Sequence, residues 1–291
     1  MNTPTSELEK SIFDIVGQIN HGKQLLENGE MKYEVAELYL LAGEKALKTS
    51  SFHSAATYFM SGIGLLQGDC WENHYNLSKK LHDAALKALF VTGEFTTLNT
   101  LASEVLTHAR NFDDKLNCYH NLVRYLVSSR QAEEGISTCI SVLEQVGETK
   151  GVAKLSLKQC VFLGGKLPIQ FSDVAVYTLY RNVMRLLSKY SEDDILKLPQ
   201  MVDQRKLVAM EFLNHMISSS NNTKPHLCAV VVLRMVDMTL KHGLCDVSAC
   251  AFSGLGNLNV HIADFDNGYR YGKVALNIMA KRTGKDNRVR H

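Results

Sequence analysis

Apolar residues recur at steps of three and four along most of the chain, which is the spacing of one face of an α-helix. The first such stripe consists of Leu8, Ile12, Ile15, Val16 and Ile19. Strict alternation of apolar and polar residues, the pattern of a half-buried β-strand, is almost absent. The pattern therefore predicts an all-α protein.

The helical stripes come in pairs separated by short polar turns. The clearest pair covers about residues 33–47 and 52–66, with the turn 48–51 between them. Small residues in this pair would let two antiparallel helices approach closely, and aromatic residues would fill the seam between this hairpin and the next. The small positions are Gly43, Ala55 and Gly62, and the aromatic positions are Phe52 and Phe59. Such a hairpin is typical of the tetratricopeptide repeat.

The same scheme returns later in the chain at irregular intervals. Phe95 stands where Phe52 stands in the first hairpin, and Ala132 takes this position in the next one. These intervals exceed the ~34 residues of a regular repeat, so we expect about five degenerate hairpins. In the last hairpin the matching residues are Phe252, Leu255 and Gly256 on the first helix, and Phe265, Gly268, Gly272 and Ala275 on the second. Stacked hairpins of this kind form an α-solenoid, whose concave face usually holds a peptide or another domain.

Glycine and proline residues interrupt the helical pattern near the middle of the chain and divide the solenoid into two predicted lobes. The interruption comprises Gly151, Gly164, Gly165 and Pro168. We expect an N-terminal helical-repeat lobe over residues 1–147, an irregular connection over 148–173, a C-terminal helical-repeat lobe over 174–282 and a basic tail over 283–291.

The composition fits this picture and narrows the class of protein. A content of 45% hydrophobic and 21% charged residues with only 4 prolines suits an ordinary helical protein. Residues 1–14 lack the basic flank and apolar run of a secretory signal, and no stretch approaches the ~20 apolar residues of a membrane span. We therefore predict a cytoplasmic protein without membrane contact.

Candidate catalytic chemistry is sparse. The seven cysteines include no Cys-x-x-Cys pair and the eleven histidines include no His-x-x-x-His pair, so we predict no metal site. A phosphate-binding loop needs Gly-x-x-x-x-Gly-Lys followed by Ser or Thr. At Gly165 and Lys166, the nearest approach to this motif, Cys160 replaces the first glycine and Leu167 replaces the hydroxyl residue. We expect neither catalytic residues nor a cofactor.

Charge is distributed unevenly, although the formal net charge is only +2. The C-terminal half is basic, and a groove for an acidic protein segment could be lined by Arg181, Arg185, Arg205, Lys206 and Arg234. The alternative is that these side chains are simply solvated. No interleaving of basic and aromatic residues accompanies the charge, so the expected partner is protein and not nucleic acid.

Two separated stretches resemble a family of large signalling proteins. The first contains Tyr58, Gly62, Leu65 and Leu66, followed by Trp71, His74, Tyr75 and Leu77. The second contains Leu198, Pro199, Met201, Asp203, Lys206, Leu207, Ala209 and Met210. Over roughly residues 30–282 the chain is similar to the helical repeat region of multidomain proteins that carry an AAA-type predicted ATPase with serine/threonine kinase, GAF and histidine kinase domains.

The resemblance implies a non-catalytic scaffold for protein–protein or interdomain contacts, acting as the regulatory arm between an ATP-hydrolysing switch and an output kinase. It also favours a packing role for Trp71 between hairpins, where the alternative is a recognition anchor. The ATPase and kinase modules of the family are absent from these residues, so we do not expect an enzyme. Two further hypotheses stay open: a free-standing adaptor that binds a short acidic peptide, and a truncated fragment of a multidomain kinase.

Overall fold

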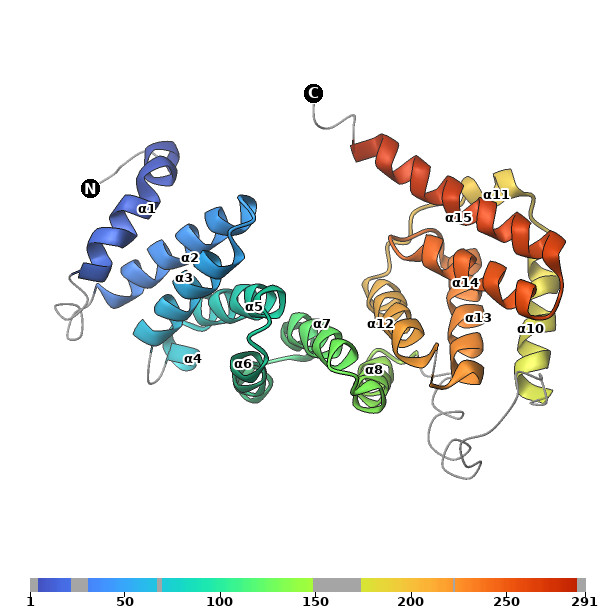
Figure 1. The fold of residues 1–291 in the computed structure, drawn as a ribbon, viewed down its shortest axis with the longest axis horizontal. Helices are drawn as coiled ribbons and strands as arrows, with labels where there is room; N and C mark the ends of the chain where they lie inside the picture. The colour runs from blue at the N-terminus through green and yellow to red at the C-terminus, as the bar shows by residue number, and fades with distance from the viewer. Residues whose placement is uncertain (1–4, 22–30, 67–69, 149–173, 222, 287–291) are drawn as a thin grey trace. The chain divides into compact units, whose positions relative to one another are not determined.

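The computed structural model of the protein describes residues 5–21, 31–66, 70–148, 174–221 and 223–286. Within these ranges every regular element is a helix, fourteen in all, and one isolated β-bridge joins Gln200 and Leu244 (Figure 1). The prediction of an all-α protein is confirmed. The helices group into two compact units, residues 1–125 and 126–291.

The first unit consists of helices α1 to α6 and most of α7. Their bounds are α1 Thr5–His21, α2 Lys32–Lys48, α3 Phe52–Leu65, α4 Cys70–Asn73, α5 Tyr75–Thr92, α6 Phe95–His108 and α7 Phe112–Ser128. α2 and α3 are the first predicted hairpin, and α5 and α6 are the second. α3 packs against both α2 and α5, so its apolar residues are enclosed from two sides.

The closest helix approaches in this unit occur at two of the predicted glycines. Phe59 on α3 is fully buried, and its ring lies so near Gly43 on α2 that a Cβ atom at position 43 would overlap it. A Cβ atom at Gly62 would come within 2.9 Å of Leu81 Cδ2 on α5. Interiors are close-packed, so such contacts leave no room for a larger side chain. These glycines therefore allow α3 to pack closely between its neighbours.

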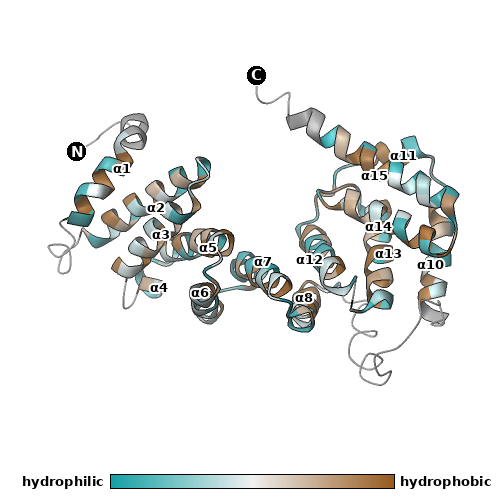
Figure 2. Cartoon of the chain, viewed as in Figure 1, coloured by the Kyte–Doolittle hydropathy of each residue, from teal (hydrophilic) through white to brown (hydrophobic). Residues whose placement is uncertain are grey.

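The second unit is built around one central helix. The bounds of its helices are α8 Ala132–Gln145, α10 Val174–Leu187, α11 Glu192–Leu196, α12 Gln204–Ser220, α13 Pro225–His242, α14 Ser248–His261 and α15 Phe265–Asp286. Twelve of the eighteen residues of α13 are buried, and this helix packs against α10, α12 and α14. Figure 2 accordingly colours long stretches of α13 as hydrophobic. α8 packs on α12, and α15 packs on α14 and α11.

The division into units does not coincide with the predicted lobes. The sequence places residues up to 147 in the N-terminal lobe, whereas α8 belongs to the second unit because it packs against α12. Most of the predicted connection, residues 149–173, lies outside the described residues, as do residues 287–291 of the predicted tail. α15 continues to Asp286, beyond the predicted end of the C-terminal lobe. The two lobes and the solenoid stay predictions.

One of the stretches that carry the family resemblance forms the isolated bridge in the second unit. The amide of Leu244 donates to the carbonyl oxygen of Pro199 at 2.8 Å, and the amide of Met201 donates to the Leu244 oxygen at 2.7 Å. Gly243 has a φ of 102°, and a Cβ atom there would overlap the Pro199 oxygen. Glycine alone adopts this conformation without strain. Pro199 and Met201, which belong to the stretch that resembles the family, therefore have a structural role in this bridge.

Candidate binding surfaces

The first unit has an open groove on the side formed by the first helices of its hairpins. We call it the α2–α5 groove, because its walls come from α2, from α4 with the start of α5, and from Arg110 before α7. Its volume is about 590 Å³. The charged side chains that line it are Glu37, Glu72, Lys80 and Arg110, and they are joined by Asn73 and Asn76. All six of these residues are exposed, so a ligand could reach them.

Tyr75 organises one wall of the α2–α5 groove. Its hydroxyl donates to Asp114 Oδ2 at 2.6 Å and accepts from the backbone amide of Arg110 at 3.0 Å. The Arg110 guanidinium lies 4.1 Å from the centre of the Tyr75 ring and donates to the carbonyl oxygen of Glu72 at 3.3 Å. Burial, reinforced by the Asp114 carboxylate, raises the pKa of Tyr75 and so favours the protonated hydroxyl that donates to Asp114. This wall is therefore preorganised before any ligand binds.

The groove offers both signs of charge and both kinds of hydrogen-bonding group. Two acidic and two basic side chains lie along it, so no single sign of charge dominates. The amide side chains of Asn73 and Asn76 offer both donors and acceptors, which is what a peptide backbone requires. Sequence reasoning did not single out these residues. The available signal was the position of Asn73 and Asn76 within the Trp71–Leu77 stretch, between the residues that carry the family resemblance.

Trp71 packs inside the first unit, although its position at a helix entrance left two roles open. Only 7% of its surface is exposed, and its indole N–H donates to Glu104 Oε1 at 2.9 Å. The ring stacks on His108 with centroids 5.3 Å apart, and the rings of Tyr75 and His82 lie at 5.9 and 4.7 Å. This placement favours the packing role and leaves little of the indole for a partner.

The other predicted repeat positions behave differently at the two ends of the chain. In the first unit Ala55 is fully buried, Phe52 is half-buried, and Phe95 lies 5.0 Å from the ring of Tyr125. In the second unit a Cβ atom at Gly256 on α14 would lie 3.0 Å from the Gly268 oxygen and 3.2 Å from the Gly272 nitrogen on α15. Phe265, in contrast, is 65% exposed, and a Cβ atom at Gly272 would meet nothing within 4 Å. The last hairpin therefore also has a close helix contact at a glycine, but Phe265 and Gly272 do not pack between helices of the second unit.

Two of the five basic candidates already have a partner within the second unit. Lys206 and Arg234 both bind the carboxylate of Glu148, and the Arg234–Glu148 distance is 2.8 Å. Burial opposes ionisation of Glu148, but the hydrogen bonds and charges of Lys206 and Arg234 outweigh it and lower the pKa of the carboxyl. Arg234 also contacts Asp237 at 3.1 Å. These two cations therefore stabilise the fold, and the sequence could not reveal Glu148 because it lies far from both along the chain.

The remaining three basic candidates lie on two different helices. Arg181 and Arg185 lie on α10, where Arg181 contacts the Tyr177 ring at 5.9 Å and Arg185 donates to Asn182 at 3.4 Å. Arg205 lies in the first turn of α12. An acidic ligand bound by all five predicted residues would have to displace Glu148 first. The proposed acidic-peptide site stays a prediction, with fewer available cations than the sequence implied.

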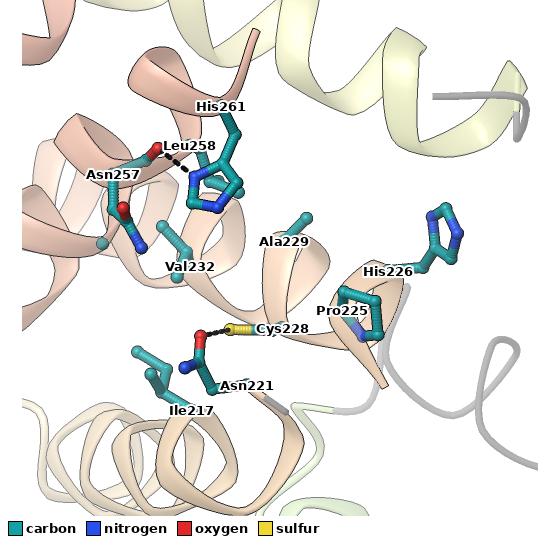
Figure 3. A pocket seen from close by; sticks show the side chains of 11 residues that line it. Ile217, Asn221, Pro225, His226, Cys228, Ala229, Val232, Asn257, Leu258 and His261 are labelled. Carbon is teal, nitrogen blue, oxygen red and sulfur yellow. Dashed lines mark hydrogen bonds between the residues drawn. The ribbon is translucent and has the colours of Figure 1, made fainter. Parts of the chain in front are cut away.

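A second, smaller pocket lies between α12, α13 and α14 (Figure 3). Its volume is about 140 Å³, and aliphatic side chains such as Ile217 and Val232 make much of its wall. Cys228 Sγ lies 3.9 Å from Asn221 Oδ1, and His261 Nδ1 is hydrogen-bonded to the Asn257 carbonyl oxygen at 2.8 Å. Such a cavity has room for one apolar side chain and a few polar atoms.

Burial disfavours the thiolate form of the cysteine in this pocket. Burial raises the pKa of the Cys228 thiol, as it raises that of Cys118 to about 12, so both stay protonated at neutral pH. In the described ranges no group of three or more His, Cys, Asp or Glu side chains could hold a metal ion. Across the same ranges, every helix is too short or too polar to span a bilayer.

Comparison with known proteins relates the chain distantly to a signalling protein. It is 20% identical over 283 residues to the hybrid signal transduction histidine kinase G of Dictyostelium discoideum. The match covers 93% of this chain and only 8% of that kinase. No protein family profile matches the chain. No solved structure matches it either.

Proposed function

We propose that this chain is a non-catalytic helical-repeat scaffold that makes protein–protein or interdomain contacts, most plainly as the regulatory arm of an ATPase or kinase signalling protein. The observation that carries the proposal is the α2–α5 groove, an open and preorganised surface on the first helices of successive hairpins. Its ligand is a peptide segment of mixed charge, from a partner or from another domain. Binding there would bias the equilibrium between two states of the larger signalling protein.

Three features support this function. The glycine contacts at Gly43 and Gly62 hold neighbouring helices at fixed spacing, so the groove wall does not have to order when a ligand arrives. The groove carries hydrogen-bonding side chains but no nucleophile paired with a base. The distant similarity to a hybrid histidine kinase fits a place in signal transduction.

A peptide selection tests the groove. The purified chain is used to select from a phage-displayed library of random peptides, and the enriched peptides are synthesised and titrated by fluorescence anisotropy. Lys80→Glu should weaken their binding roughly tenfold, because it reverses one of the two basic side chains in the groove. Lys87→Glu is the matched control, since Lys87 is exposed on the same helix α5 but does not line the groove.

Equal weakening by both lysine variants would show that binding depends on general charge and would contradict the proposal. A library that yields no enriched peptide would also contradict it. The non-catalytic part needs a separate measurement, in which the purified chain is incubated with ATP and magnesium and released phosphate is followed. If phosphate release persists in Lys166→Ala, the chain is an enzyme and the non-catalytic part of the proposal is wrong. The same result would show that Lys166 does not act as a phosphate-binding lysine.

The free-standing adaptor for an acidic peptide is a separate hypothesis with a distinguishable test. Charge reversal at Arg181 and Arg185 would weaken such a peptide without affecting one held in the α2–α5 groove. High salt should weaken it as well, because exposed charges are screened.

A further inference from the structure

The outer face of α15 carries a row of large apolar side chains in solvent. Phe265, Tyr269 and Leu276 are 65%, 77% and 68% exposed, and Met279 further along is 55% exposed. With Gly272, these positions follow the alternating four- and three-residue steps of a coiled-coil seam. We call this row the α15 stripe (α15 is red in Figure 1). Soluble monomers rarely expose a contiguous apolar patch of this kind without a use for it.

The stripe is separate from the face by which α15 is held in its own chain. Tyr271 and Val274 are 1% and 0% exposed and pack inward, where α15 contacts α14 and α11. The α15 stripe consequently adds little to the stability of the unit, and deleting it would remove side chains that are mostly in water.

Gly272 in the middle of the stripe is not explained by packing within the chain. A Cβ atom there would meet nothing within 4 Å, so the space in front of it is open. Glycine inside a helix is less favourable than alanine, and here no contact of its Cβ position within the chain requires it. Its effect is a hollow in the stripe between Tyr269 and Leu276.

We propose that the α15 stripe is a self-association surface, and that two copies of this chain pair through it as antiparallel helices. The hollow at Gly272 of one copy would receive Tyr269 of the other, and Phe265 would pack on Leu276. A parallel pair would set glycine against glycine and leave a void between aromatic and leucine layers, which dense packing disfavours. Size complementarity therefore selects the antiparallel arrangement.

Complementary charges favour the same antiparallel alignment of the two helices. In the arrangement with Tyr269 over Gly272, the exposed residue Asp266 of one copy lies opposite Lys273 of the other, and twofold symmetry repeats this contact. A shift by one heptad would set Lys273 against Lys273 and place Gly272 opposite Leu276. Lys273 already contacts Glu192 of its own chain at 3.5 Å, but its side chain is 53% exposed and can turn toward a second carboxylate.

Light scattering on the full chain over a concentration series tests the proposal. We expect the mass to rise from monomer to dimer as concentration increases. Gly272→Leu fills the hollow that receives Tyr269 and should leave the chain monomeric throughout, while its melting temperature stays equal or rises because the site is open within the chain. Gly64→Leu is the matched control, because Gly64 is an exposed helical glycine on α3 whose Cβ atom would also meet nothing. It should leave the dimer unchanged.

A charge exchange tests the register. Asp266→Lys turns two attractive contacts into repulsive ones and should weaken the dimer by about fivefold to tenfold. Adding Lys273→Asp in the same chain should restore it, since opposite charges again face each other.

Three outcomes would overturn the proposal: a wild-type chain that is monomeric at every concentration, a dimer that persists in Gly272→Leu, or a double charge exchange that fails to restore the dimer. The first of these would leave the stripe to a different protein. The α2–α5 groove lies in the other unit, so peptide binding there would survive any of the three.

Discussion

The first and last hairpins of the chain follow the same pattern of small and large residues, yet they use it differently. In the first, Phe59 fills the space at Gly43 and is completely buried, because α3 is covered by α2 and by α5. In the last, Gly272 stands where Phe59 stands in the first, and backbone meets backbone at Gly256 and Gly268. Phe265, the counterpart of the half-buried Phe52, remains in solvent. One sequence pattern can therefore build an interior seam in one place and an outer surface in another.

The difference arises from what lies next to each second helix. A hairpin buries one face internally and needs a neighbour to bury the other, so repeat proteins are stabilised by contacts between adjacent repeats. α3 has α5 beside it, whereas α15 has α14 and the short α11 on its inner side. Substitutions in the two hairpins should reveal this difference as unequal losses of stability.

The largest effect is expected for Phe59→Ala. It removes a fully buried aromatic side chain that packs against Gly43 on α2, and it should lower the free energy of unfolding by about 3 to 5 kcal/mol. Chemical denaturation followed by circular dichroism measures this loss. A loss below about 1 kcal/mol would mean that the first hairpin is not packed as described.

Gly256→Leu is expected to have the next largest effect. The atoms nearest its Cβ are the backbone oxygen of Gly268 and the backbone nitrogen of Gly272, which cannot move aside as a flexible side chain would. Overpacking should separate α14 from α15 and cost about 2 to 3 kcal/mol. Gly17→Leu serves as the control, because a Cβ atom at Gly17 would meet nothing within 4 Å. If Gly256→Leu and Gly17→Leu have the same melting temperature, the close approach of α14 and α15 does not require glycine at position 256.

The helices could be predicted from the sequence for a physical reason. Helical periodicity and the alternation of glycine with aromatic residues are local, and Gly43 and Phe59 are close enough along the chain to be read as one unit. Exposure of Phe265 could not be predicted in this way. The residue occupies the same pattern position as Phe52, and whether it is buried depends on an element beyond its own hairpin.

Ion pairs between residues that are far apart in the sequence could not be predicted either. Lys206 and Arg234 were predicted as candidate ligands for an acidic partner, because their charge is visible in the sequence and their partner is not. Glu148 lies 58 residues from Lys206 and 86 residues from Arg234 along the chain. The α2–α5 groove was missed for a related reason, since Glu37 and Arg110 join the polar residues of α4 and α5 only when the chain folds.

Glu148→Gln should have an intermediate effect within the second unit. It leaves Lys206 and Arg234 without their carboxylate, and because these cations are 22% and 21% exposed the loss should be modest, about 1 to 2 kcal/mol at neutral pH. The pKa of Glu148 is lowered by folding, so its contribution is present above the ordinary carboxyl value and disappears as the pH falls through the folded value. Denaturation at a series of acidic pH values should show a smaller pH dependence in the variant.

An exposed ion pair in the same unit gives the matched control for Glu148. Glu133 contacts Lys224 at 3.2 Å, but its side chain is 82% exposed. Glu133→Gln should change stability by less than about 0.5 kcal/mol, since solvent screens such pairs. Equal losses in the two variants would contradict the special role of the Glu148 cluster.

The smallest effect is expected for Phe265→Ala, which removes the same atoms as Phe59→Ala. Because 65% of Phe265 is already in water, its deletion should change the free energy of unfolding by less than about 0.5 kcal/mol when measured on dilute protein. The same substitution should nevertheless weaken self-association, because Phe265 belongs to the α15 stripe. A large loss of stability in the dilute chain would mean that α15 is covered from within, and the contrast between the two hairpins would then disappear.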